Sequence, residues 1–168
     1  MNEFSIHLGN AGKGIVSSVL AASKYILAPI FVLTALATFL SQMEGASMIT
    51  GQIDLARLKD NVLVLGTLIA LLAFFRGFYP RGSLSRCVFG VAVSLLVCIW
   101  IWVIAMGGNM TLTMEEASFS ISYLGFVLLF ILAAALRGAF FAAEMLSYRK
   151  EWLASLEPQA VPAGSETA

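Results

Sequence analysis

Residues 76–86, RGFYPRGSLSR, separate two strongly apolar halves of this 168-residue chain. The stretch holds three arginines and no acidic residue. Pro80 and two glycines prevent a helix from running through it. Because short loops rich in lysine and arginine stay on the cytoplasmic side of a membrane, the stretch predicts a cytoplasmic turn between two membrane-spanning halves.

The composition indicates an integral membrane protein. Hydrophobic residues make up 60% of the chain and charged residues 12%, and the mean hydropathy is +0.90. This leaves too little polar surface to cover a soluble domain. The formal net charge at pH 7 is zero, because basic and acidic segments balance one another. The charge balance therefore argues against nucleic acid as a partner, and the apolar surface predicts membrane lipids instead.

Four apolar runs predict four transmembrane helices. The predicted spans are residues 25–40, 62–79, 87–106 and 121–141. Apolar runs that cross a membrane form helices, because lipid offers the backbone no hydrogen-bond partners. Residues 107–120 carry two glutamates and no lysine or arginine, as expected on the side opposite to the basic turn. The predicted fold is an all-α integral membrane bundle of four transmembrane helices in the cell membrane, with both termini cytoplasmic.

The segments outside the spans are predicted from their composition. The amphipathic pattern of residues 15–20 predicts a helix at the inner interface that runs into the first span. Pro29 predicts a kink in that span. Mixed charges in residues 41–61 predict an interfacial helix on the outer side. We expect residues 1–157 to form a single transmembrane domain and residues 158–168 to form a disordered tail.

Basic residues beside the spans suggest an internal duplication. Lys24 precedes the first span as Arg86 precedes the third. Arg76-Gly77 closes the second span as Arg137-Gly138 closes the fourth. This pattern is typical of a parallel repeat of two helical hairpins. The alternative is that any two hairpins with cytoplasmic ends acquire basic flanks, and the residues between these flanks match poorly.

Residue types that carry chemistry are scarce in the predicted spans. The only histidine, His7, lies outside all of them, and no acidic residue lies at the centre of a span. Cys87 and Cys98 lie about 16 Å apart if one helix carries both, which is too far for a disulfide. No group of histidine, cysteine and acidic residues has the spacing of a metal site. We therefore predict that the chain is not an enzyme and has no catalytic residue, metal or cofactor.

A stripe of hydroxyl side chains follows one face of the first span. It consists of Ser23, Thr34, Thr38 and Ser41. In an oligomer this stripe would line a narrow, wet pore. Hydroxyl groups in membrane helices also donate to carbonyls of their own helix or of a neighbouring one. Both interpretations of the stripe are open.

A ladder of small residues follows one face of the fourth span. It consists of Ala134, Gly138 and Ala142, with Ala135, Ala139 and Ala143 beside it. Small residues at this spacing let another helix approach closely. We therefore predict that the ladder is a helix-packing surface. Its partner is either the second span or another subunit.

Five charged residues gather at the inner edge of the predicted bundle. They are Lys24, Arg76, Arg86, Arg137 and Glu144. Glu144 lies two turns after Arg137 and is the nearest acidic residue on the same helix. One interpretation is a binding site for an anionic lipid headgroup, or a cytosolic gate. The other is ordinary snorkelling of basic side chains, which fixes the topology.

These observations predict a structural or accessory component of a membrane assembly. We expect it to be oligomeric and to associate with copies of itself or with other membrane subunits. The alternative is a homo-oligomeric channel lined by the first span.

Overall fold

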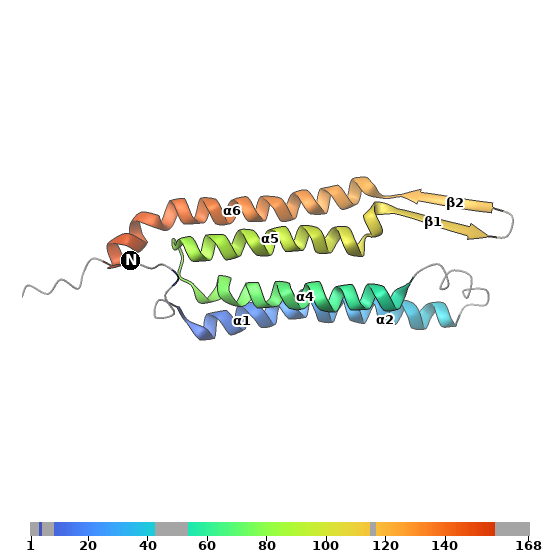
Figure 1. Ribbon diagram of the computed structural model, residues 1–168, viewed down its shortest axis with the longest axis horizontal. Coiled ribbons are helices and arrows are strands. Elements are labelled where there is room, and N and C mark those ends of the chain that lie inside the picture. Colours follow the sequence, from blue (N-terminus) through green and yellow to red (C-terminus); the bar gives the residue numbers. More distant parts are fainter. Residues whose placement is uncertain (1–3, 5–8, 43–53, 115–116, 157–168) are drawn as a thin grey trace, which may run out of the picture.

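The structure is a computed structural model that describes residue 4 and residues 9–42, 54–114 and 117–156. In this part of the chain four long helices lie side by side, and a β-hairpin projects from one end of the bundle (Figure 1). Each of the four helices is long and apolar enough to cross a membrane. The prediction of a helical bundle with four helices that could span a membrane is therefore confirmed.

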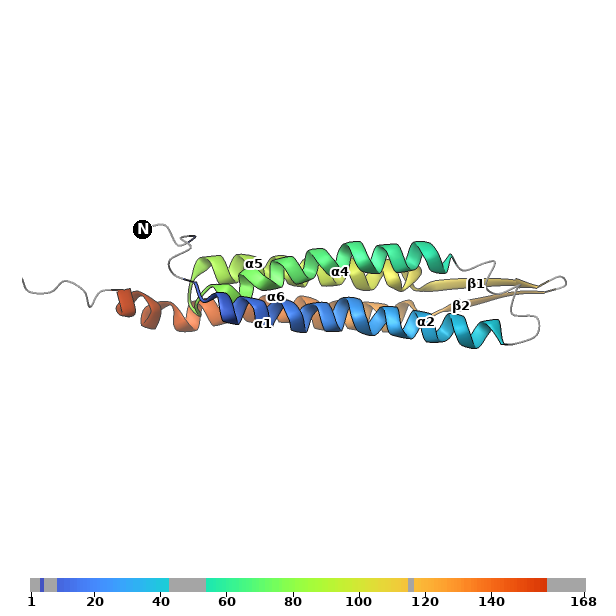
Figure 2. The same ribbon diagram turned by 90° about the horizontal axis from the view of Figure 1, so that it is seen from below.

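The first helix runs from Ala11 to Ser41 in three consecutive parts. They are α1 (Ala11–Ala22), the π-helical turn η2 (Ser23–Leu27) and α2 (Ala28–Ser41). The other helices are α4 (Leu55–Phe78), α5 (Leu84–Ile104) and α6 (Leu124–Leu156). The start of α1, the turn between α4 and α5 and the end of α6 lie together, and we call this the turn end (Figures 1 and 2). The opposite end is the hairpin end.

The π-helical turn directly precedes the proline that was expected to kink the first span. The N–H of Ala28 donates to the carbonyl of Ser23, five residues earlier instead of four. Pro29 then lies in the first turn of α2, where a missing N–H disturbs a helix least. Pro29 is thus accompanied by an altered hydrogen-bond pattern, and α1 and α2 remain one continuous helix (Figure 2).

The hairpin end differs from its predicted form. The helix α4 begins at Leu55, and the carboxylate of Asp54 caps it by accepting from the N–H of Arg57 at 2.9 Å. The described part of segment 41–61 therefore belongs mainly to the spanning helix and not to a separate interfacial helix. Residues 43–53 lie outside the described residues.

The connection between α5 and α6 contains a β-hairpin that the sequence analysis did not identify. Strands β1 (Asn109–Met114) and β2 (Ala117–Ser122) pair antiparallel, with Asn109 opposite Ser122. Their sequences alternate threonine or serine with larger apolar residues, as is typical of strands. Next to the hairpin, the hydroxyl of Tyr123 donates to the carbonyl of Ala105 at 2.9 Å. The fourth helix consequently begins only at Leu124.

Glycines allow close packing within each pair of helices. A Cβ on Gly66 of α4 would lie 2.8 Å from the carbonyl oxygen of Tyr25. A Cβ on Gly90 of α5 would lie 2.5 Å from the ring of Phe141. The core between the pairs consists of Ala21 and Tyr25 from the first helix, Ile69, Ala70 and Ala73 from α4, and Val93 and Val97 from α5. The bundle is thus two closely packed helical hairpins that meet along α4 and α5.

The turn between α4 and α5 is confirmed as the break between the two halves. Tyr79 is extended before Pro80, and the Ser83 side chain caps α5 by accepting from the N–H of Arg86 at 3.3 Å. Gly82 has a φ of +82°, and a Cβ there would lie 2.5 Å from the carbonyl oxygen of Tyr148. Both its backbone conformation and the lack of space therefore require glycine, and α6 packs directly on this turn.

Candidate functional site

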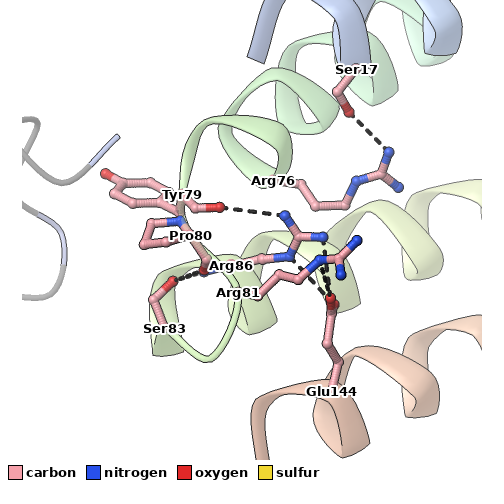
Figure 3. Close-up of polar contacts among 8 residues, drawn as sticks. All are labelled: Ser17, Arg76, Tyr79, Pro80, Arg81, Ser83, Arg86 and Glu144. Carbon is pink, nitrogen blue, oxygen red and sulfur yellow. Dashed lines mark hydrogen bonds and ion pairs between the residues drawn. The ribbon is translucent and has the colours of Figure 1, made fainter. Parts of the chain in front are cut away.

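A buried carboxylate joins α6 to the turn between α4 and α5 (Figure 3). The Glu144 side chain is only 8% exposed. Nε and Nη2 of Arg86 donate to its two oxygens, each at 3.3 Å, and Nε of Arg81 lies 3.4 Å from Oε1. The two parallel bonds of Arg86 are the strong, bidentate form of this ion pair. We call Arg81, Arg86 and Glu144 the arginine clasp.

Backbone carbonyls of the turn extend the arginine clasp. Nη1 of Arg86 donates to the carbonyl of Tyr79 at 3.4 Å. Nη1 of Arg149, on the last part of α6, donates to the carbonyl of Gly82 at 3.5 Å. Removing one partner of a buried ion pair is strongly destabilising, because the other charge is left unpaired. These contacts therefore fix α6 to the turn, and the geometry of Glu144 indicates a structural role.

Arg76 links three helices close to the clasp. Its Nη2 donates to the hydroxyl of Ser17 on α1 at 3.0 Å (Figure 3). Its guanidinium group lies over the ring of Phe141 on α6, 5.4 Å from the ring centroid. This cation–π contact and the hydrogen bond hold the side chain between the first helix and α6.

A groove lies between the first helix and α6, and we call it the basic groove. It consists of two cavities of about 480 and 510 Å³. Both cavities are lined by Lys24, Tyr25, Val93 and Arg137. The first reaches the start of α1 and includes Arg76, so it lies towards the turn end. The second extends towards the hairpin end and is lined mainly by apolar residues such as Trp100, Ile101 and Phe130.

Positive charge dominates the part of the basic groove near the turn end. Lys24, Arg76 and Arg137 come from three different elements, η2, α4 and α6. Within the described part of the chain, none of the three forms a salt bridge and no acidic residue lines either cavity. The charge of Arg137 instead repels that of Arg76. This arrangement can attract an anion.

The structure thus divides the five charged residues of the predicted inner edge into two groups. Arg86 and Glu144 belong to the arginine clasp, whereas Lys24, Arg76 and Arg137 line the basic groove. Glu144 pairs with residues far away in the sequence and not with Arg137 on its own helix. Sequence reasoning missed Arg81 and Ser17 as partners in these contacts. The only signal for Arg81 was its place in the basic turn.

The hydroxyl stripe of the first helix does not line the basic groove. The hydroxyl of Thr38 donates to the carbonyl of Thr34 at 3.0 Å, and that of Ser41 donates to the carbonyl of Thr38 at 2.7 Å. Ser23 and these three residues are exposed on the outside of the bundle. Thr34 and Thr38 lie in a shallow hollow between Phe31 and Phe39. The pore stays a prediction, since a single chain does not enclose this surface.

The small-residue ladder packs against α5. A Cβ on Gly138 would lie 2.9 Å from Oγ of Ser94, and that hydroxyl donates to the carbonyl of Ala134. Ala142 is partly buried, but the second row, Ala135, Ala139 and Ala143, is exposed. The partner of the ladder is therefore the third span of the same chain. The sequence analysis had considered the second span or another subunit.

No known protein family, curated protein or solved structure matches this chain. Within the described residues, no group of three histidine, cysteine or acidic residues could hold a metal ion. Two surfaces of the molecule are therefore the candidates for function, the basic groove and the exposed outer half of the first helix.

Proposed function

We propose that this chain is a structural or accessory component of a membrane assembly and that α2 is one of its assembly surfaces. The supporting observation is how little of α2 its own chain covers. Only Leu33 is buried among its 14 residues, whereas Phe31 is 76% and Phe39 is 61% exposed. The hollow between these two rings has a volume of about 410 Å³. A bulky side chain from a helix of another subunit would fill it.

The character of this hollow favours packing over a pore. Helices associate in lipid through close van der Waals contact and not through the hydrophobic effect, so a complementary hollow matters more than apolar character. Thr34, Ala35 and Thr38 are small and form its floor. The hydroxyl of Thr38 already donates to its own helix, which leaves it no unsatisfied donor for a water column. The homo-oligomeric channel is the alternative.

Cysteine cross-linking tests the assembly surface. In a cysteine-free background, Thr38→Cys should form cross-links to another copy or to a second membrane subunit when membranes are treated with a short bifunctional reagent. Leu129→Cys is the matched control, because Leu129, which is 61% exposed, is an exposed residue of a spanning helix as Thr38 is. Mass spectrometry identifies each product. Equal yields from both positions, together with a monomer in mild detergent, would contradict the proposal.

We propose further that the chain lies in the cell membrane and that the turn end is on its cytoplasmic side. The support is the charge distribution, because the turn end carries Arg76, Arg81, Arg86 and Arg149, whereas residues 107–122 carry no lysine or arginine. The start of α4, at the hairpin end, is the exception, with Arg57 and Lys59 beside two aspartates. In the cysteine-free background, an impermeant thiol reagent applied from outside should label Asn109→Cys and leave Lys150→Cys unmodified. The reverse result would invert the topology.

The contacts give mixed support to a parallel repeat of two hairpins. A Cβ on Gly77, after Arg76, would lie 3.1 Å from Oγ of Ser17, and one on Gly138, after Arg137, would lie 2.9 Å from Oγ of Ser94. Each hairpin thus brings an Arg-Gly pair to a serine of its opening helix. However, Lys24 follows Ser17 whereas Arg86 precedes Ser94. The match between Lys24 and Arg86 that suggested the repeat therefore does not fit the contacts.

A further inference from the structure

We propose that the basic groove binds one anionic phospholipid, with its phosphate among Lys24, Arg76 and Arg137 and one acyl chain along the apolar cavity. The proposal concerns the space between the first helix and α6. It does not depend on the assembly surface of α2, and each can fail without the other.

The positive charge of Arg137 lies deep within a spanning segment. Arg137 lies seven residues before Glu144 on α6, which places its Cα about 10 Å further from the turn end. A charged side chain inside a spanning segment requires a partner or access to water. Glu144 is occupied by Arg81 and Arg86, and no acidic residue among those that the structure describes lines the groove. A lipid phosphate would supply the missing negative charge.

Basic side chains from several elements converge on the same cavity. Snorkelling alone would let each basic side chain turn towards the nearest headgroups by itself. Here cations from α1, η2, α4 and α6 (Lys13, Lys24, Arg76 and Arg137) line one cavity, although like charges repel one another. Arg76 is also held in place by Ser17 and the ring of Phe141. An anion shared by these residues would relieve the repulsion.

The apolar cavity beside the basic one identifies the anion as a lipid. The basic cavity is adjoined by an apolar one, and Lys24, Tyr25, Val93 and Arg137 line both. Their volumes of about 480 and 510 Å³ lie within the range of about 300–1,000 Å³ that is typical of sites for single small ligands. Phe130, on the rim of the apolar cavity, is 62% exposed, so the groove is open sideways to the membrane. A phosphate with an attached acyl chain fits both parts.

Native mass spectrometry tests the proposal. The full chain is reconstituted in nanodiscs that contain equal amounts of phosphatidylglycerol and phosphatidylcholine with identical chains. We expect wild-type protein to retain one phosphatidylglycerol molecule. Each cation near a membrane surface contributes roughly 1 kcal/mol to binding an anionic lipid, so Lys24→Gln with Arg137→Gln should reduce the preference about 30-fold. Lys150→Gln, an exposed cation outside the groove, is the matched control and should have no effect.

Two further measurements separate the headgroup from the chain. Ala133 lines the apolar cavity and is exposed, so Ala133→Phe should fill it and reduce lipid retention while all charges remain. Glycerol phosphate, which has the charge but no chains, should not displace the bound lipid. Arg137→Lys keeps the charge and should keep the preference, which shows that a change of side chain at this position is tolerated.

Several results would overturn the proposal. They are equal retention of the two lipids by the wild type, an unchanged preference in the double variant, an unchanged retention in Ala133→Phe, or displacement by glycerol phosphate. A stable lipid-free dimer that is disrupted by Ala133→Phe would show instead that a protein helix occupies the groove.

Discussion

The two sides of α6 differ sharply, although they are built from neighbouring residues. On one side Gly138 lies against Ser94 of α5, and Glu144 is held by Arg81 and Arg86. On the other side Arg137, the residue before Gly138, faces the first helix across the basic groove. The first side is closed by close packing and a paired charge. The second is open and its charge has no carboxylate partner among the described residues, so stability and ligand binding are expected to depend on different sides of the same helix.

The largest effect is expected where the closed side has no space. Gly138→Leu should lower the free energy of unfolding by about 3 kcal/mol, because the added side chain forces α6 away from Ser94. The measurement is thermal unfolding in mild detergent. Gly125→Leu is the matched control, since a Cβ at Gly125 meets nothing within 4 Å. Equal, small effects of the two substitutions would show that the α5–α6 contact does not hold the bundle together.

A smaller loss is expected when the arginine clasp is broken. Glu144→Gln leaves Arg86, whose side chain is 21% exposed, without its carboxylate. We expect a loss of about 2 kcal/mol, less than for a fully buried pair because Arg86 is partly solvated. Arg81→Gln should cost only about 0.5 kcal/mol, since surface ion pairs contribute little and its side chain is 66% exposed. If Arg81→Gln were the more damaging change, the bidentate pair would not be the main contact.

A substitution on the open side should weaken lipid binding and leave the stability of the lipid-free protein nearly unchanged. Arg137→Gln should change the unfolding free energy by no more than about 0.5 kcal/mol in detergent without anionic lipid. The substitution removes a charge that repels Arg76 and breaks no salt bridge with a described residue. Added phosphatidylglycerol should then raise the melting temperature of the wild type more than that of the variant. A strong loss of stability without lipid would mean that Arg137 belongs to the closed side.

The smallest effect is expected at the hydroxyl stripe. Thr34→Val with Thr38→Val removes hydroxyl groups at nearly constant volume from an exposed surface, and we expect stability to change by less than about 0.5 kcal/mol. We also expect wild-type protein reconstituted in vesicles to show no ion flux. Flux through the wild type that the double variant abolishes would favour the channel over the assembly surface.

The elements that the sequence predicted well are those with local signals. The four helices follow from long apolar runs, and the turn after Phe78 follows from Pro80, Gly82 and the surrounding arginines. The β-hairpin was not predicted, because its strands are short and directly adjoin the last apolar run. Their alternating pattern carries much less signal than a spanning helix.

The candidate site was predictable only in part, because its contacts join distant segments. The five charged residues were found by composition, but Glu144 and Arg86 are 58 residues apart. Helical spacing relates Glu144 only to residues on its own helix, such as Arg137. The basic groove was not predictable, because it exists where the first helix and α6 leave space between them.

The π-helical turn η2 sets the rotational phase of the outer half of the first helix. One additional residue in a turn rotates all that follows by about 100° relative to an uninterrupted α-helix. Leu33, the only buried residue of α2, therefore faces inward because of the length of the segment from Ser23 to Leu27. Deleting one residue there would restore α-helical spacing and leave Leu33 facing inward, whereas an uninterrupted α-helix of the unchanged sequence would turn Leu33 away by about 100°. The additional residue in this turn, more than the identity of its side chain, then decides which surface α2 presents to its surroundings.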